Sequence, residues 1–161
     1  MSDEFDNFIE ALQEEIFNET KAAYGDVFFE RWRHLRYMGK IDNPDAYAAV
    51  TGSCGDTIQI FLNFENDRVK EASFLTDGCG SSAVCGSFAA EMAHGKNPNE
   101  LLEVSGEAIL QKLGGLPEED EHCAFLASET LADALKDYMI KQRQKDRRKE
   151  DERQPEGLRS H

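Results

Sequence analysis

The sequence predicts an α+β fold, a small three-stranded antiparallel sheet with helices packed on one face. Three observations support this prediction. Apolar residues recur at helical spacing near the start of the chain, they alternate with polar residues in its middle, and helical spacing returns after Gly80. An order of helix, then strands, then helices is typical of a sheet with helices on one side.

The first element is expected to be an amphipathic helix within residues 1–25. Acidic residues separate an apolar set at helical spacing, and Gly25 is expected to end the helix. The apolar set is Phe5, Phe8, Ile9, Leu12 and Ile16. A second, shorter helix is expected at 27–35 and contains the only tryptophan, Trp32.

The sheet is expected after a loop at 36–46, in which Asn43-Pro44 is a turn signal. Residues 47–51 are expected to form a short first strand. Residues 57–64 and 69–76 alternate between apolar and polar side chains, the spacing of a half-buried strand. The short polar turn at 65–68 joins these two strands into an antiparallel hairpin.

The second half of the chain returns to helical spacing. Helices are expected at 81–94, 99–103, 105–113 and 123–142. Residues 143–161 are charged and almost without apolar side chains, which predicts a frayed or disordered tail. The chain is therefore divided into an N-terminal helix (1–25), one domain (26–142) and this tail.

Charge and hydropathy exclude several classes of function. The net charge is −14, with residues 1–140 carrying −17 and residues 141–161 carrying +3. An acidic body argues against nucleic acid as the main partner. No window holds the roughly 18 consecutive apolar residues of a membrane helix. The first residues are acidic, unlike a secretory or transit peptide, so a cytoplasmic location is expected.

Three of the four cysteines lie at the ends of predicted elements. Cys54 and Cys79 are flanked by glycines, and Cys79 and Cys123 come at the starts of predicted helices. Helix N-termini favour the thiolate form that binds metals. Without an export signal, metal binding or catalysis is a better explanation than disulfides. Thiolates select zinc, copper(I) or iron–sulfur clusters, so these cysteines predict a soft-metal site.

Two further residues are candidate donors, each with an alternative interpretation. Asp56 or His122 would complete a tetrahedral set with the three thiols. Alternatively, Asp56 caps the turn before the strand and His122 is a surface histidine. The fourth cysteine, Cys85, is interpreted as a small packed residue, with a ligand-exchange or partner-thiol role as the alternative.

With these motifs in order, the chain resembles a divergent member of the U-type iron–sulfur cluster assembly scaffolds, the family of IscU and the N-terminal domain of NifU. The matching segments are Gly52-Ser53-Cys54-Gly55-Asp56, Gly78-Cys79-Gly80-Ser81, Leu116-Pro117 and His122-Cys123. The stretch from Met38-Gly39 to Asp42-Asn43-Pro44-Asp45-Ala46 is similar to the N-terminal loop of the family. The resemblance covers about residues 30–140.

The resemblance implies a non-enzymatic scaffold on which a two-iron, two-sulfur cluster forms. A cysteine desulfurase supplies sulfur as a persulfide, and an electron donor such as ferredoxin supplies the electrons. The cluster then leaves for a carrier or an apo-protein. Cys54, Cys79 and Cys123 match the cluster ligands, and Asp56 and His122 match the additional ligands. Cys123 matches the persulfide acceptor, and such a site also takes zinc.

Among the departures from the family pattern, one concerns a partner. Where the family has Leu-Pro-Pro-Val-Lys, which a dedicated Hsp70-type chaperone recognises, this chain has Leu116-Pro117-Glu118-Glu119-Asp120. The substitution puts that chaperone route in doubt. Two other functions remain open from the residues themselves. One is a zinc-containing sulfur-transfer acceptor with a persulfide on Cys123, and the other is a zinc-stabilised interaction domain.

Overall fold

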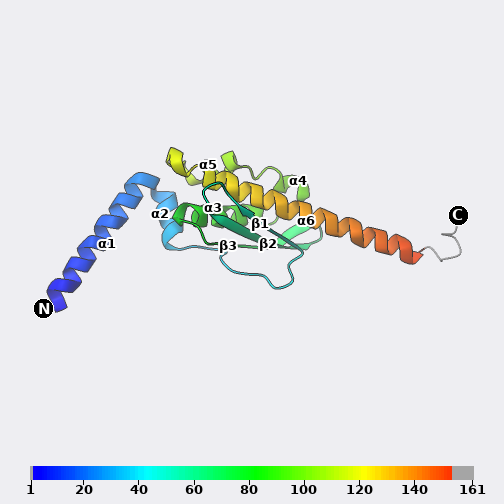
Figure 1. Cartoon of the computed structure of the whole chain (residues 1–161), viewed down its shortest axis with the longest axis horizontal. Coiled ribbons are helices and arrows are strands. Elements are labelled where there is room, and N and C mark those ends of the chain that lie inside the picture. The colour runs from blue at the N-terminus through cyan, green and yellow to red at the C-terminus, as the bar shows by residue number, and fades with distance from the viewer. Residues whose placement is uncertain (1, 154–161) are drawn as a thin grey trace.

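The computed structural model describes residues 2–153 and confirms the α+β fold (Figure 1). The helices and strands follow in the order α1 (Ser2–Tyr24), α2 (Asp26–Arg33), β1 (Ala46–Thr51), β2 (Thr57–Glu65), β3 (Arg68–Thr76), α3 (Gly80–Ala93), α4 (Pro98–Leu101), α5 (Gly106–Leu113), a 3₁₀ turn (Glu118–Asp120) and α6 (His122–Arg153). The three predicted strands are thus present, close to their expected bounds.

The sheet is an antiparallel meander with the strand order β1-β2-β3. β1 pairs with β2 from Ala46 opposite Leu62 to Thr51 opposite Thr57. β2 and β3 are joined through Asn66 and Asp67, whose φ angles are 54° and 61°. Two consecutive positive φ angles are the geometry of a tight hairpin turn that follows the natural twist of the strands. β2 is therefore the central strand and is hydrogen-bonded to β1 on one side and to β3 on the other.

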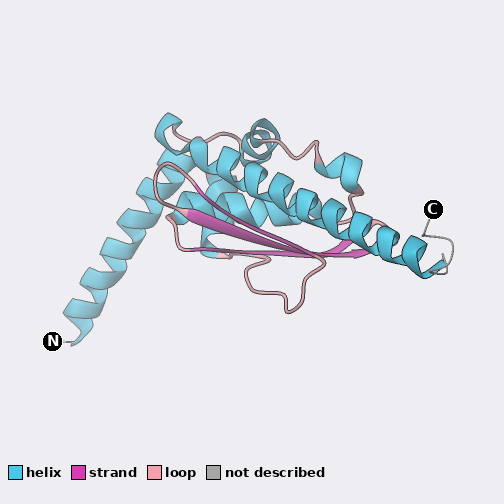
Figure 2. Cartoon of the chain, turned by 45° about the vertical axis from the view of Figure 1, so that its right-hand side comes forward, coloured by secondary structure: helices cyan, strands magenta, loops and turns pink. Residues whose placement is uncertain are grey.

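The helices α3 and α6 lie on one face of the sheet and form the core with it (Figure 2). Ile58, Ile60 and Leu62 of β2 have no exposed surface, as their alternation predicted. α3 is buried on almost every side, and Gly86 lets it approach the sheet closely. A Cβ atom at this glycine would lie 2.6 Å from the ring of Phe74. The helix that follows Cys79 is therefore packed closely against the sheet.

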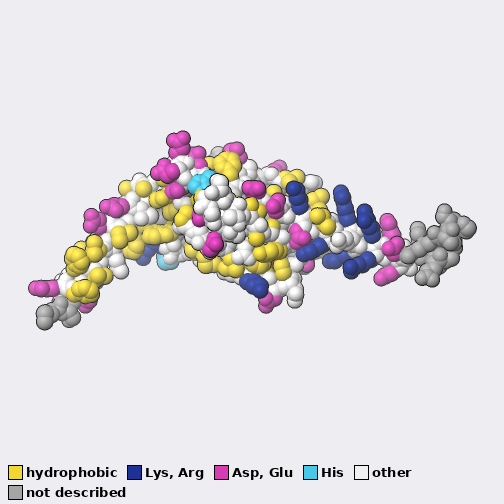
Figure 3. Space-filling view, in the orientation of Figure 1, with side chains coloured by type: hydrophobic (Ala, Val, Ile, Leu, Met, Phe, Trp, Pro, Cys, Tyr) yellow, Lys and Arg dark blue, Asp and Glu magenta, His cyan; other side chains and the backbone are white. Residues whose placement is uncertain are grey.

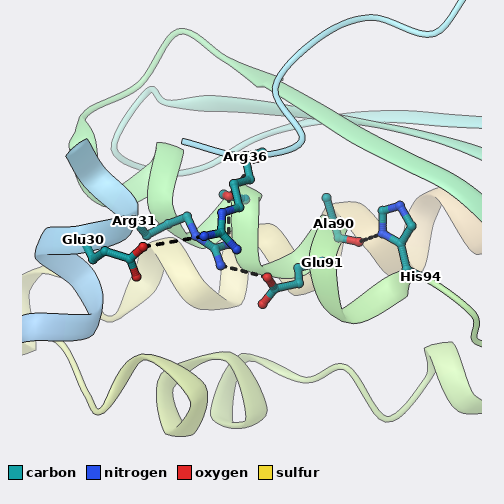
Figure 4. A network of polar contacts seen from close by, with 7 residues as sticks. Glu30, Arg31, Arg36, Ala90, Glu91 and His94 are labelled. Atoms are coloured by element: carbon teal, nitrogen blue, oxygen red, sulfur yellow. Dashed lines mark hydrogen bonds and ion pairs between the residues drawn. The ribbon is translucent and has the colours of Figure 1, made fainter. Parts of the chain in front are cut away.

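Helix α2 is anchored to α3 through one buried arginine (Figure 4). Arg31 is 6% exposed and donates hydrogen bonds to Glu91 at 2.8 Å and to Ser87 at 3.0 Å. Its guanidinium group also lies 3.9 Å from the ring centre of Phe88. A buried charge is tolerated only when it is paired and hydrogen-bonded in this way. The N-terminal helices are thus connected to the core.

The prediction of a frayed or disordered tail from residue 143 is wrong for residues 143–153, which continue α6 to Arg153. Lys, Arg, Gln and Glu dominate this segment, and all four favour helix without needing an apolar partner. Residues 154–161 lie outside the described part of the chain. At the other end of the molecule, α1 points away from the sheet (Figure 1). Within residues 2–153, no helix has the length and apolar character needed to cross a membrane.

Candidate metal centre

The candidate donors lie at one end of the sheet. β1 ends and β2 begins there, so the connecting loop at 52–56 lies at this end. β3 ends at Thr76 on the same side, because it runs antiparallel to β2, and Cys79 follows as the residue that precedes α3. The start of α6, with His122 and Cys123, packs against α3. Segments far apart in the sequence are therefore brought together by the meander.

Three donor residues converge at this end. Asp56, Cys79 and Cys123 each place a ligand atom within 4.8 Å of the ligand atoms of the other two. Two thiolates on one tetrahedral zinc ion lie about 3.8 Å apart, given metal–sulfur bonds of about 2.3 Å. The two sulfur atoms therefore need to approach each other by at most about 1 Å to reach that spacing. The arrangement can therefore supply two soft sulfur donors and one hard oxygen donor to a single metal.

A fourth side chain, Ser82, connects the oxygen and sulfur donors and was not predicted. Its hydroxyl donates to Asp56 Oδ2 at 2.8 Å and lies 3.4 Å from Cys123 Sγ. Ser82 is fully buried and stands three residues after Cys79, on the first turn of α3. That spacing turns a side chain back toward the helix start, which is the one signal in the sequence that could have suggested its position.

Asp56 is held at the N-terminus of α3. Besides the Ser82 hydroxyl, the backbone N–H of Cys79 donates to Asp56 Oδ2 at 3.4 Å. Hydrogen bonds to the charged form, first from Ser82 and then from Cys79, lower the pKa of Asp56 below its usual value. Gly78 has no space for a side chain, since a Cβ atom there would lie 2.6 Å from Asp56 Cγ. The carboxylate is thus kept ionised and close to both thiols.

The sequence predicts a thiolate at Cys123, but burial of this residue favours the neutral thiol. Cys123 has no exposed surface, and desolvation is the main cause that raises the pKa of its thiol to about 12. The favourable position at a helix N-terminus is outweighed because a charged sulfur loses its hydration there. Without a metal, Cys123 is therefore a neutral thiol, and a metal ion that binds must displace its proton.

The other two candidate donors lie near this cluster without belonging to it. His122 is exposed, and its Nε2 lies 3.6 Å from Cys123 Sγ. Cys54 is exposed on the turn closed by the Gly55 N–H and the Gly52 carbonyl oxygen, and it is not in the set of mutually close donors. Gly55 has a φ of 92°, a left-handed conformation that glycine adopts readily. The structure thus assembles Asp56, Cys79 and Cys123 and leaves Cys54 exposed on the loop that precedes Asp56.

Cys85 lies in the hydrophobic core and is not one of the three converging donors. It has no exposed surface, and burial is the main cause that raises the pKa of its thiol above the usual value. Both properties are those of a small packed residue, the first of the two interpretations given to it above.

A cavity of about 240 Å³ adjoins the donor cluster on the side of α1 and α2. Cys79 and Gly80 form one wall of it, and Tyr24 and Trp32 form another. The Tyr24 hydroxyl donates to Asp120 Oδ2 at 2.6 Å, so the end of α1 is joined to the segment that precedes α6. This hydrogen bond raises the pKa of Tyr24 above its usual value. The contact was not predicted, because its partners are 96 residues apart.

Comparison with known proteins places these features in a family context. The family model described as the NifU-like N terminal domain matches residues 23–145. The chain is 35% identical over 128 residues to the iron–sulfur cluster assembly scaffold protein IscU 1 of Archaeoglobus fulgidus, covering 79% of this chain and 84% of that protein. It is 34% identical over 122 residues to the iron–sulfur cluster assembly scaffold protein IscU of Aquifex aeolicus, covering 74% and 78%.

A solved structure has the same fold. The crystal structure of the N-terminal part of a nitrogen-fixing NifU-like protein from Brucella abortus superposes with a TM-score of 0.60 and a sequence identity of 19%. The match covers 75% of this chain and 97% of that one. At this level of identity the comparison supports the three-stranded α+β architecture.

Proposed function

Because this chain belongs to the NifU-like N-terminal domain family, we propose that it is a scaffold on which a labile iron–sulfur cluster is assembled and then passed on. The observation that carries the proposal is the convergence of Asp56, Cys79 and Cys123 within 4.8 Å. Thiolates bind the iron of such a cluster durably, whereas a carboxylate is a harder and weaker ligand for that iron. A mixed set is suited to assembly followed by release.

The proposed cargo is a two-iron, two-sulfur cluster held by Cys54, Cys79 and Cys123, with Asp56 or His122 as the remaining donor. Cys54 joins the set when its glycine-flanked loop moves inward from its exposed position. Sulfur comes from a cysteine desulfurase, electrons from a donor such as ferredoxin, and the finished cluster goes to a carrier or apo-protein. Each of these partners follows from the proposed role.

Cys123 is the proposed sulfur acceptor. Because Cys123 is buried, the site must first open to admit the desulfurase persulfide. The deprotonated sulfur of Cys123 then attacks the outer sulfur of that persulfide, a new S–S bond forms on Cys123, and the desulfurase cysteine leaves as a thiolate. Since burial keeps the Cys123 thiol protonated, a base must first remove its proton. His122 Nε2, 3.6 Å from the sulfur, is positioned to accept it.

Anaerobic reconstitution with ferrous iron and sulfide tests the proposal. We expect a coloured protein with visible sulfide-to-iron absorption and about two irons per chain. Cys79→Ser should lose most of the colour, whereas Cys85→Ala, which removes a sulfur outside the donor cluster, should keep it. A wild-type protein that stays colourless and without iron would overturn the scaffold proposal.

A zinc-containing sulfur acceptor is the second candidate, because two cysteines and one carboxylate also suit tetrahedral zinc. In that case Cys123 passes a persulfide onward without iron. Mass spectrometry after incubation with a cysteine desulfurase and cysteine distinguishes the two. Stoichiometric transfer of the extra sulfur to a second protein in the absence of iron favours the zinc-containing acceptor.

A further inference from the structure

Helix α1 carries an apolar stripe without a partner in the described part of the chain. Phe5, Phe8, Leu12 and Ile16 follow one another at intervals of three or four residues, so they share one face of the helix. They are 64%, 61%, 40% and 51% exposed. A continuous row of exposed large apolar side chains is costly in water and indicates a surface that another molecule covers.

The stripe has an acidic border. α1 contains seven Asp and Glu residues against one lysine, and helical spacing places Glu15 and Glu19 directly beside the apolar row. Two such helices would repel each other if they paired through this face. An anionic membrane surface is disfavoured for the same reason. The occupant must therefore offer apolar side chains within a basic border.

The middle of α6 offers that surface. Met139 and Ile140 are 46% and 56% exposed, and together with Lys136 and Arg143 they line a shallow hollow of about 190 Å³ on one face of the helix. Beyond this hollow, residues 141–153 contain seven Lys and Arg against four Asp and Glu. Figure 3 shows the apolar and acidic side chains over α1 at one tip of the molecule and the basic side chains over α6 at the other.

We propose that α1 of one copy binds the surface formed by Lys136, Met139, Ile140 and Arg143 on α6 of a second copy, and that the second copy reciprocates. The two tips point away from each other in one chain, so two chains lying antiparallel place each α1 against the opposite α6. The same contact is then made twice about a two-fold axis, which closes the assembly as a dimer rather than a filament.

Sedimentation velocity of the full chain measures the association directly. At about 0.05 M salt we expect a dimer, and at about 0.5 M salt a dissociation constant raised at least about tenfold, because salt screens the charged borders. The double variant Phe5→Ser/Phe8→Ser changes only exposed side chains and should be monomeric. A wild-type protein that remains monomeric at low salt would overturn the proposal.

A charge exchange identifies the two surfaces. Glu15→Lys/Glu19→Lys and Lys136→Glu/Arg143→Glu should each weaken the dimer about tenfold, since each turns two attractions into repulsions. Combining all four substitutions should restore it toward the wild-type value. If the α6 pair has no effect while Phe5→Ser/Phe8→Ser still abolishes the dimer, α1 binds elsewhere and the proposal is wrong.

Discussion

Ser82 contacts both the oxygen donor Asp56 and the sulfur donor Cys123. A hydroxyl has one proton to donate, and here it lies 2.8 Å from Asp56 Oδ2 and 3.4 Å from Cys123 Sγ. The shorter contact is the stronger hydrogen bond, so Ser82 mainly orients the carboxylate. Its role in a scaffold would be to position Asp56 and not to bind the cluster.

For Ser82→Ala we expect a reconstituted cluster whose lifetime changes about fivefold, in the same direction as in Asp56→Ala, because outer hydrogen bonds tune a ligand. The double variant Asp56→Ala/Ser82→Ala should behave like Asp56→Ala alone, since both changes act through one carboxylate. Cluster decay followed by absorption measures this. Ser128→Ala, which removes a hydroxyl bonded only within α6, is the matched control. Additive effects would contradict a positioning role.

Asp56→Ala itself tests the source of lability. Without the hard oxygen donor, we expect sulfur donors to hold the cluster, so its transfer to an apo-ferredoxin slows by about tenfold. The rate of transfer, followed by circular dichroism of the acceptor, measures this. Faster release from Asp56→Ala would show that the carboxylate holds the cluster in place instead of loosening it.

At this scale the sequence indicated some of the side chains that converge and missed others, for clear reasons. Asp56, Cys79 and Cys123 stood in recognisable motifs, and the fold brings them together. Ser82 had no such motif, and serine on the first turn of a helix is common. The protonation of Cys123 depends on burial, which no local pattern reports. The exposed position of Cys54 likewise depends on a loop conformation that the flanking glycines leave free.

At the scale of the elements, the attachment of α2 to α3 depends on Arg31. Its partners Ser87 and Glu91 lie on α3, so this side chain joins the N-terminal helices to the helix that follows Cys79 (Figure 4). Arg36 and Glu30, which also pair in this region, are both well exposed. The two arginines therefore offer a direct comparison between a buried and an exposed pair.

Arg31→Met should lower the free energy of unfolding by about 2 kcal/mol, because two hydrogen bonds of a buried charged group are lost and Glu91 is left unpaired. Arg36→Met should change it by less than about 0.5 kcal/mol, as is usual for an exposed ion pair. Urea unfolding followed by circular dichroism measures both values. Equal losses would contradict the special position of Arg31.

The elements were predictable wherever an apolar pattern defined them. The alternation in β2 and β3 and the helical spacing in α1, α3 and the first part of α6 all correspond to observed elements. The far end of α6 was missed because it has no apolar face and is helical through intrinsic propensity. The Tyr24–Asp120 contact was missed because local patterns do not report which distant elements touch.

At the scale of the whole molecule, the acidic body and basic end were visible in the sequence, but their arrangement required the fold. α1 and the extension of α6 leave the core in opposite directions, which separates the acidic apolar surface from the basic one (Figure 3). Within one chain, α1 cannot reach the basic surface on α6. In the proposed dimer, a second copy covers both surfaces. The sequence indicated that acidic and basic residues are unevenly distributed along the chain. The structure shows that the acidic and basic segments extend from opposite ends of the core (Figure 1).

The donor cluster also has a consequence for the empty and loaded forms of the protein. Its ligands come from the loop before β2, the start of α3 and the start of α6, so one bound ion would tie three separate segments to each other. Ligand binding to the native state lowers the population of locally opened forms. With zinc as the probe, amide hydrogen exchange should slow at these three segments and remain unchanged in α1. The loaded scaffold would then be the more rigid species, and release of its cargo would restore mobility at the very end where the next sulfur has to enter.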